Sequence, residues 1–477
     1  MPPLPEGLIV VAKRDCPTCQ LIEPLLADIE REAGPLTVYS QDDPTFAEGV
    51  AGAQHDATLE HSFSLKTEFV PTLIRVKDGQ EVERTYGWHR EDWQKLTGMA
   101  GLGADLPLMR PGCGSKTLEP GIAEKLELQF GDTRLSAREI DTDADDLIEA
   151  CYERGWSDGL PVVPPTPERV LRMLKGTDRD PAEEIGLVPP DLAPCTVEKV
   201  AINAVMAGCK PEYMPVVLAA LEAALTDEFG LHGLLCTTMF AGPMIIANGP
   251  VTRAIGMNSG ANALGQGNRA NATIGRALQL IVRNVGGGRP GEIDRATLGT
   301  PGKYTFCFAE AEDSEWLPLA EERGVPSGHS AVTLFAAEGV QGIVDQKSRN
   351  PESLAKSFAL ALRAVDHPKM AMAGDAVLVV SPEHSRVFID AGWSKARLLQ
   401  ELEGLLQFPG EEMVAGAGGI AEGIPEKFRD KTVPKFRPGG LLIVRAGGTA
   451  GLFSAVIAGW AASGPVGSSP VTREVKV

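Results

Sequence analysis

Arg14-Asp15-Cys16-Pro17-Thr18-Cys19 is the stretch that decides the fold of the first part of this chain. Residues 8–12 before it form a short apolar run, which predicts a buried strand. Residues 20–29 after it carry apolar side chains at helical spacing. The two cysteines therefore lie where a strand ends and a helix begins, about one helical turn apart.

This position predicts redox chemistry for the two thiols. At a helix start, unpaired backbone N–H groups and the positive end of the helix dipole stabilise a thiolate, which lowers the pKa of the first cysteine. We therefore expect Cys16 to attack and Cys19 to resolve the mixed disulfide. A C-x-x-C pair is equally typical of half a zinc site. The sequence has no second C-x-x-C pair and no H-x-x-x-H pair, so zinc would need distant ligands, and no metal is predicted.

Strands and helices continue to alternate after this pair. Residues 68–76 are predicted to form a strand that opens with a proline. Residues 77–79 turn the chain into a partner strand over residues 80–87. A helix over residues 89–96 completes the segment, so the first 100 residues or so are predicted to form one small domain.

This order of elements resembles the thioredoxin fold. The resemblance implies that Cys16 and Cys19 are the redox pair and that Pro71 follows a cis peptide bond beside them. X–Pro is the bond at which the cis form costs least. Buried strands and helices alternate again from about residue 197 to 460, which indicates an α/β core. The predicted class is α/β, with an N-terminal thioredoxin-like fold followed by a larger α/β domain.

Composition and charge exclude several kinds of partner. The chain has 477 residues, of which 43% are hydrophobic, and a net charge of −19. Binding to nucleic acid or to an anionic membrane surface needs a basic face, so neither is expected. The first residues lack a basic stretch followed by a long apolar core, so no secretory signal is expected. The eight cysteines fit a reducing compartment, and cytoplasmic localisation is predicted.

A third cysteine follows the predicted domain boundary. Residues 101–111 are rich in glycine, leucine, proline and aspartate, and we place the first domain boundary there. We expect a thioredoxin-like domain over 1–102, a cysteine-bearing connecting segment over 103–160 and an α/β substrate or catalytic domain over 161–477. Glycines flank Cys113 and leave its sulfur open to close approach, while Lys116 favours its thiolate. The alternative is an ordinary turn that happens to contain a cysteine.

Cys113-Gly114-Ser115-Lys116 resembles the motif of the UGSC-type protein family. In that family selenocysteine or cysteine begins the motif and cysteine ends it. Cys113, Gly114 and Ser115 match, whereas Lys116 departs from the final cysteine. This departure argues against a disulfide within the motif, so a two-thiol relay would have to use Cys16 and Cys19.

Two glycine-rich loops are candidate anion sites. Residues 256–269 follow a buried strand and lead into a helix, where exposed backbone N–H groups could hold a carboxylate or phosphate. The residues expected to bind the substrate there are Arg253, Asn268 and Arg269. The second loop, residues 446–451, contains Gly447 and Gly448 between a strand and a predicted helix over residues 452–460, although tight packing explains its glycines equally well.

Neither loop fits a nucleotide cofactor well. Gly265 and Gly267 partly match the dinucleotide fingerprint, but the preceding strand ends about fifteen residues too early. No cofactor is therefore predicted. A strand over residues 376–380 ends in polar residues, which makes Glu383 and His384 acid/base candidates. A helix start at Ser381 accounts for the same stretch.

Three hypotheses for function follow. The first is a thiol-disulfide oxidoreductase whose dithiol takes electrons from a cellular dithiol reductant and regenerates a reactive cysteine, most simply Cys113. That cysteine would act on a small, anionic molecule by reductive cleavage or disulfide reduction. The second is a small-molecule-binding α/β protein that is switched by its thioredoxin-like domain. The third is a non-redox lyase or hydrolase that uses His384 and Glu383. Self-association to a homo-oligomer is left open.

Overall fold

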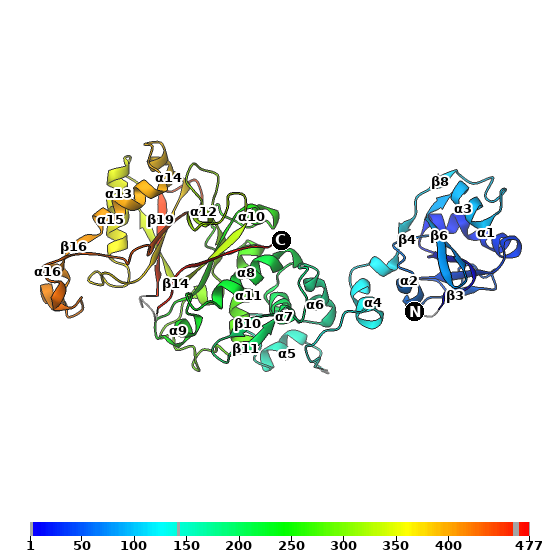
Figure 1. Ribbon diagram of the computed structural model, residues 1–477, viewed down its shortest axis with the longest axis horizontal. Coiled ribbons are helices and arrows are strands. Elements are labelled where there is room, and N and C mark those ends of the chain that lie inside the picture. The colour runs from blue at the N-terminus through cyan, green and yellow to red at the C-terminus, as the bar shows by residue number, and fades with distance from the viewer. Residues whose placement is uncertain (1–2, 141–143, 461–466, 477) are drawn as a thin grey trace. The chain divides into compact units, whose positions relative to one another are not determined.

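A computed structural model describes residues 3–140, 144–460 and 467–476 (Figure 1). The chain divides into two compact units, Met1–Arg134 and Leu135–Val477. The predicted α/β class is confirmed for the chain as a whole. The predicted boundary after residue 102 is wrong, because residues 103–134 belong to the first unit and residues 135–160 to the second.

The first unit is built on a five-stranded sheet in the order β3-β2-β1-β5-β6. Neighbours β1 and β2, and β2 and β3, are parallel, whereas β1 and β5, and β5 and β6, are antiparallel. The strands are β1 (Gly7–Ala12), β2 (Leu36–Ser40), β3 (Ala53–His55), β5 (Thr72–Lys77) and β6 (Gln80–Tyr86). The helices are α1 (Pro17–Ala33), α2 (Glu60–Ser64), α3 (Arg90–Thr97) and α4 (Ile122–Phe130).

Local sequence explains these elements. Strand β1 is buried along almost its whole length, as a central strand of apolar residues should be. Helix α1 has Cys16 at its N-cap and Pro17 at its first position, where the missing N–H costs nothing. The β5–β6 turn consists of Asp78 and Gly79, both with positive φ (54° and 70°). Two-residue hairpins favour this backbone, which explains the Asp-Gly pair.

The segment that follows the hairpin and α3 folds back onto the first unit in two short strands. Strand β8 (Met109–Arg110) pairs with β7 (Trp88–His89), and β9 (Cys113–Gly114) pairs with β4 (Phe69–Val70). A short 3-10 helix, Lys116–Leu118, comes next. The region expected to connect two domains is therefore an integral part of the first unit.

The second unit is built on a seven-stranded sheet. The path is β13-β12-β14-β19-β15-β18, with β20 paired to β14. These strands are β12 (Gly242–Asn248), β13 (Cys307–Ala309), β14 (Ala331–Val344), β15 (Ala376–Val380), β18 (Leu441–Arg445), β19 (Phe453–Gly459) and β20 (Val471–Glu474). Two small two-stranded sheets stand apart from this sheet: β10 (Glu184–Val188) with β11 (Ala193–Thr196), and β16 (Gln407–Pro409) with β17 (Thr432–Pro434).

Helices cover both halves of this sheet (Figure 1). The first half carries α5 (Leu147–Glu153), α6 (Pro167–Leu174), α7 (Val197–Ala207), α8 (Met214–Ala224), α9 (Leu231–Cys236), α10 (Pro250–Ala254) and α11 (Arg269–Asn284). Helix α12 (Leu319–Glu322) contacts both β14 and β18. The second half carries α13 (Pro351–Arg363), α14 (Pro382–Ile389), α15 (Lys395–Leu405) and α16 (Gly410–Met413). A separate buried cluster underlies each helical layer, so each half has its own core. In the described part of the chain, no helix combines the length and apolar character that a bilayer crossing requires.

The strand pairing of the second unit repeats itself, although the sequence showed no short-period repeat. In the first half, β12 pairs in parallel with β13 and antiparallel with β14. In the second half, β15 pairs in parallel with β18 and antiparallel with β19. Proline opens the helix after each leading strand, as Pro250 in α10 and Pro382 in α14. The two halves join through β14 and β19.

The helix predicted over residues 452–460 is wrong, because this segment forms the strand β19. It lies between β14 and β15, and its residues Ala455, Val456 and Ile457 are buried. A central strand buried on both faces carries apolar residues without alternation. Such a run cannot be distinguished from a buried helix by periodicity alone.

Candidate functional site

Three sulfur atoms meet at the start of α1 in the first unit. Cys16 is the N-cap residue of α1, and Cys19 lies in its first turn; both are fully buried. Cys113 is half-buried on β9, where it is the register partner of Val70. The Sγ atom of Cys16 lies 3.5 Å from the carbonyl oxygen of Val70. The cysteine expected in a connecting segment thus lies beside Cys16 and Cys19.

The three thiols have different pKa values for identifiable reasons. Hydrogen bonds lower the pKa of Cys16 to about 5. The bond from the Cys19 thiol has the largest effect, burial opposes it, and the bond from the Cys113 thiol lowers the pKa further. Burial raises the pKa of Cys19, and the neighbouring Cys16 adds to this rise. Burial and Cys16 also raise the pKa of Cys113. At neutral pH one negative charge is therefore held on Cys16 by two thiol donors.

Two side chains from different parts of the unit, Thr18 and Gln41, hold the segment around Cys113 in place. The Thr18 hydroxyl donates to the carbonyl oxygen of Pro111 at 2.7 Å. The side-chain amide of Gln41 donates to the Ser115 hydroxyl at 2.7 Å, and its oxygen accepts from the backbone N–H of Lys116 at 3.0 Å. These contacts fix the residues on both sides of Cys113.

Gly112 allows the segment before Cys113 to pass close to Val70. A Cβ atom at Gly112 would lie only 2.7 Å from the carbonyl oxygen of Val70. The chain can therefore pass the β4 strand at this distance only without a side chain. Since Cys16 is fully buried beneath this segment, Cys113 is the more accessible of the two sulfurs.

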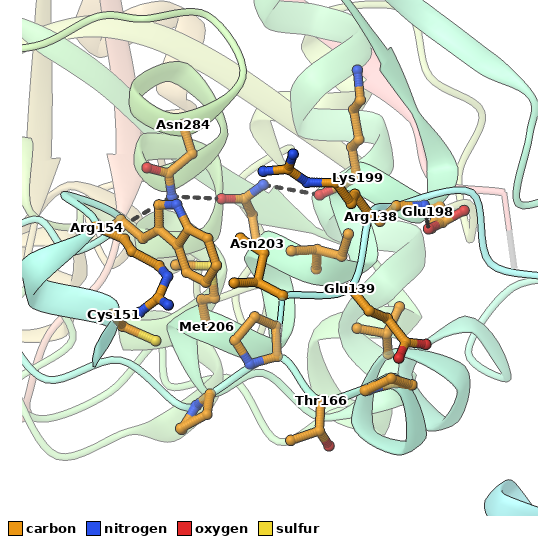
Figure 2. A pocket seen from close by; sticks show the side chains of 18 of the residues that line it. Arg138, Glu139, Cys151, Arg154, Thr166, Glu198, Lys199, Asn203, Met206 and Asn284 are labelled. Carbon is orange, nitrogen blue, oxygen red and sulfur yellow. Dashed lines mark hydrogen bonds between the residues drawn. The ribbon is translucent and has the colours of Figure 1, made fainter. Parts of the chain in front are cut away.

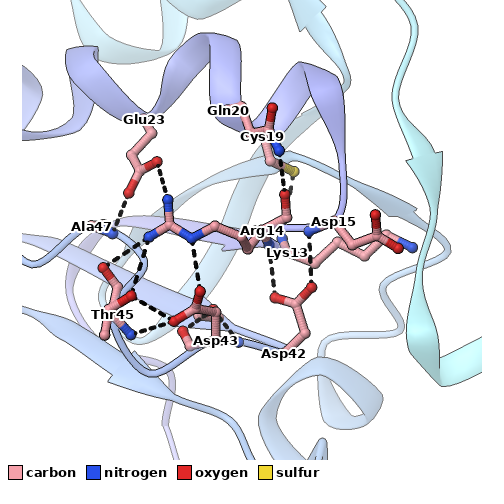
Figure 3. A network of polar contacts seen from close by, with 11 residues as sticks. Lys13, Arg14, Asp15, Cys19, Gln20, Glu23, Asp42, Asp43, Thr45 and Ala47 are labelled. Atoms are coloured by element: carbon pink, nitrogen blue, oxygen red, sulfur yellow. Dashed lines mark hydrogen bonds and ion pairs between the residues drawn. The ribbon is translucent and has the colours of Figure 1, made fainter.

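A polar network fixes the loop that precedes Cys16 (Figure 3). The carboxylate of Asp42 accepts from the backbone N–H groups of Arg14 and Asp15 at 2.7 and 2.9 Å. The guanidinium of Arg14 forms ion pairs with Glu23 and Asp43, both at 2.9 Å. No local sequence pattern predicts these roles of Asp42 and Asp43, because they lie about 28 positions from the loop that they hold.

The structure agrees with the prediction for Pro71 and differs from the prediction for Lys116. The Val70–Pro71 bond is cis, as expected. The cation that lowers the pKa of Cys113 is Lys13. Lys116, predicted for that role, instead holds the segment through its backbone N–H.

His384 and Glu383 do not form an acid/base pair in the described structure. His384 is buried, with Nδ1 lying 2.7 Å from the Ser454 hydroxyl and Nε2 lying 3.0 Å from the Asp345 carbonyl oxygen. A carbonyl only accepts, so Nε2 carries the proton and Nδ1 accepts from Ser454. The Glu383 carboxylate accepts from the backbone N–H of Leu452 at 2.7 Å. Both side chains thus fasten α14 to its neighbours, and the alternative of a helix start at Ser381 is confirmed.

The two glycine-rich loops lie side by side, and Gly447, Asn268 and Arg269, three of the residues predicted to bind an anion, make other contacts. The backbone N–H of Gly447 donates to the carbonyl oxygen of Ser259 at 2.9 Å, so it does not point at an anion. Asn268 caps α11, and the guanidinium of Arg269 donates to the carbonyl oxygen of Gly208 at 2.9 Å. The anion site predicted at a helix start after Gly448 is wrong, because β19 follows. Arg253 is exposed at the end of α10.

Within the described residues, no group of three or more histidine, cysteine, aspartate or glutamate side chains is arranged to hold a metal ion. The cluster of Cys16, Cys19 and Cys113 is therefore the candidate functional site of the first unit. Neither a scan against models of known protein families nor a search of curated protein sequences gives a match to this chain, so the site is interpreted from its own geometry.

Proposed function

We propose that the first unit is a thioredoxin-like dithiol module and that the protein is a thiol-disulfide oxidoreductase in which Cys16 and Cys19 regenerate Cys113. The observation that carries this proposal is the position of Cys16 between two thiols that lower its pKa to about 5. Because this pKa lies below 7, Cys16 is ionised at neutral pH. The thiolate is the nucleophilic form of cysteine. Cys113 supplies the sulfur that a small molecule reaches first.

The reaction proceeds by three exchanges. Cys113 passes its proton to the Cys16 thiolate, and the Cys113 thiolate so formed attacks a small disulfide R–S–S–R′. This step forms a mixed disulfide with R–S and releases R′–S⁻, which takes the proton from Cys16 and leaves as R′–SH. The Cys16 thiolate then attacks Sγ of Cys113, forming a Cys16–Cys113 disulfide and releasing R–S⁻. Finally Cys19 loses its proton to a released thiolate and attacks Cys16, which frees Cys113 and leaves a Cys16–Cys19 disulfide. Two electrons pass from the dithiol to the substrate, and an external dithiol reductant restores the pair.

The pKa of Cys19 suits the last step. The hydrogen bond and the negative charge of Cys16 both contribute to the raised pKa of Cys19. When Cys16 enters a disulfide it loses its charge, so these two contributions vanish and Cys19 ionises more readily. The resolving thiol is therefore released at the stage when it is needed.

Placement of Cys113 in the same unit removes the need for one domain to reach across to the other. Strand β9 holds the sulfur of Cys113 beside Cys16, so the two sulfurs meet at a high effective concentration. For short tethers this effective concentration is on the order of 1 mM or more. The cellular dithiol reductant, the small disulfide substrate and the cytoplasmic setting remain parts of this proposal.

Disulfide mapping tests the proposed exchange. A Cys19→Ser variant cannot resolve, so oxidation with excess hydroxyethyl disulfide should accumulate a Cys16–Cys113 disulfide, identified by mass spectrometry of peptides. The matched control adds Cys236→Ser, which removes an exposed cysteine of the second unit and should change nothing. Adding Cys113→Ser should leave Cys16 bonded to mercaptoethanol. Absence of the Cys16–Cys113 linkage in the first variant would overturn the proposal.

A further inference from the structure

The two cysteines of the dithiol have no exposed surface in the described structure. Cys16 and Cys19 are both 0% exposed, whereas Cys113 is only half-buried. Thiol-disulfide exchange requires the attacking sulfur to reach the sulfur that it attacks. An external thiol or disulfide therefore meets Cys113 first, and it has no direct path to Cys16 while the chain around Cys113 stays in place.

Strand β9 occupies the backbone edge beside Cys16. It pairs antiparallel with β4, and Cys113 lies opposite Val70 in this pairing. The backbone N–H of Ser115 continues the contact by donating to the carbonyl oxygen of Glu68 at 2.9 Å. A polypeptide often docks on another protein by adding a strand to a free sheet edge. Here that edge is already paired, so a second polypeptide cannot add a strand beside Cys16 unless β9 leaves.

Three contacts hold the covering segment, residues 107–115, in this position. The indole N–H of Trp88 donates to the carbonyl oxygen of Pro107 at 2.7 Å, before β9. The side-chain amide of Gln41 donates to the Ser115 hydroxyl at 2.7 Å, after β9. The hydroxyl of Thr18 holds the stretch between them. Since Trp88, Gln41 and Thr18 are themselves buried, the covering segment is fastened to the interior of the unit.

We propose that Cys113 is the single port of the dithiol, through which electrons both enter and leave, and that the covering segment keeps polypeptides off Cys16 and Cys19. This inference rests on the proposed function and adds the route by which the external dithiol reductant acts. That reductant is a dithiol whose sulfur reaches Cys113, and it does not dock against Cys16.

Regeneration through Cys113 consists of three exchanges. The Cys113 thiolate attacks Sγ of Cys16 in the Cys16–Cys19 disulfide, and the departing Cys19 thiolate takes the proton that Cys113 gave up. A thiolate of the reductant then attacks Sγ of Cys113 and frees Cys16 as a thiolate. The second thiol of the reductant passes its proton to Cys113 and attacks its own partner sulfur, which frees Cys113 and leaves the reductant as a disulfide. Two electrons reach the dithiol, and one proton goes to solvent because Cys16 stays ionised.

Reduction of the oxidised dithiol by dithiols of two sizes tests this route. The full chain is oxidised with excess hydroxyethyl disulfide, freed of oxidant, and mixed with dithiothreitol or with a separate, reduced thioredoxin. Acid quenching, alkylation and mass spectrometry of peptides then follow the loss of the Cys16–Cys19 disulfide. Cys113→Ser should slow reduction by both dithiols. The loss should be about tenfold or more for thioredoxin, because a protein dithiol must wait for the covering segment to open.

Opening the covering segment should restore direct access to Cys16. Gly112→Ala adds a Cβ atom that collides with β4, and Thr18→Val removes one of the three fastening contacts. Each should recover part of the lost rate with thioredoxin when combined with Cys113→Ser. Gly114→Ala is the matched control, because nothing lies within 4 Å of a Cβ atom there, and the rate should stay low.

Cysteines of the second unit are controls for the port. Cys151 lines a cavity of about 590 Å³ in that unit (Figure 2). Cys236 is exposed. Neither belongs to the first unit, so Cys151→Ser and Cys236→Ser should leave the rate of reduction by thioredoxin at the wild-type value.

Far-ultraviolet circular dichroism and thermal denaturation check that each variant is folded, and Cys113→Ala should behave as Cys113→Ser does. Reduction of the folded Cys113 variants as fast as wild type, by either dithiol, would overturn the inference. The proposed function survives that result if Cys19→Ser still accumulates the Cys16–Cys113 disulfide. Absence of that disulfide would instead contradict the proposed function, so the two failures are distinguishable.

Discussion

Cys113 is paired in register with Val70, the residue whose carbonyl oxygen lies 3.5 Å from Sγ of Cys16. A register shift of one residue in a strand pair turns a side chain to the opposite face. The β4–β9 pairing therefore decides whether the sulfur of Cys113 meets Cys16 and Cys19 or faces away from them.

The low pKa of Cys16 should depend more on Cys19 than on Cys113. The thiolate absorbance that Cys16 contributes, taken as the difference between wild type and Cys16→Ser, should titrate at a pH of about 5. Cys19→Ala should raise this midpoint more than Cys113→Ala, because the Cys19 hydrogen bond is the largest cause. A larger rise in Cys113→Ala would contradict the arrangement. Cys236→Ala is the control and should leave the midpoint in place.

Stability should follow the same ionisation. The pKa of Cys16 is lower in the folded chain than in the unfolded chain, so its ionisation stabilises the fold fully above the unfolded pKa. This contribution falls away as the pH drops from about 9 toward about 5. Urea denaturation should therefore show a difference between wild type and Cys16→Ser that grows as the pH rises through this window. A difference that shrinks with rising pH would show the opposite sign and contradict the assigned pKa.

Gly112→Ala should displace the segment that covers Cys16. Its added Cβ would lie 2.7 Å from the Val70 carbonyl oxygen, so β9 must move. We expect faster alkylation of Cys16 by iodoacetamide at pH 7 and a higher Cys16 pKa. Gly114→Ala is a matched control, because nothing lies within 4 Å of a Cβ atom there. Equal alkylation rates in the two variants would mean that the segment does not shield Cys16.

Asp42→Ala should loosen the loop before Cys16. Two backbone N–H groups, of Arg14 and Asp15, lose their acceptor, at a cost of about 1 to 3 kcal/mol in the free energy of unfolding. Chemical denaturation of the first unit measures this loss. Asp105→Ala removes an exposed carboxylate and should stay near wild type, within about 0.5 kcal/mol.

His384→Gln should alter stability without altering chemistry. The buried imidazole bonds to both Ser454 and Asp345, so its replacement should lower the free energy of unfolding by about 1 to 3 kcal/mol. Disulfide exchange by the cysteine cluster should keep its wild-type rate. A selective loss of activity in a fully stable variant would restore His384 as an acid/base candidate.

Much of the local structure was readable from the sequence. The apolar run at residues 8–12, the helix after Cys16 and the Asp78-Gly79 hairpin follow from patterns within a few residues, where periodicity and turn chemistry act directly. The strand over residues 376–380 was predicted for the same reason. Residues 452–460 were mistaken for a helix, because burial on both faces removes the alternation that marks a strand.

What the sequence determined by itself was the dithiol at a helix start, because backbone geometry next to Cys16 is set by its immediate neighbours. The third cysteine beside that dithiol is instead set by long-range contacts of the folded chain. Strand pairing between segments more than forty residues apart brings Cys113 to Val70, and side chains from Thr18 and Gln41 hold it there. Contacts of this kind depend on which surfaces bury each other when the chain folds, and no local pattern records them.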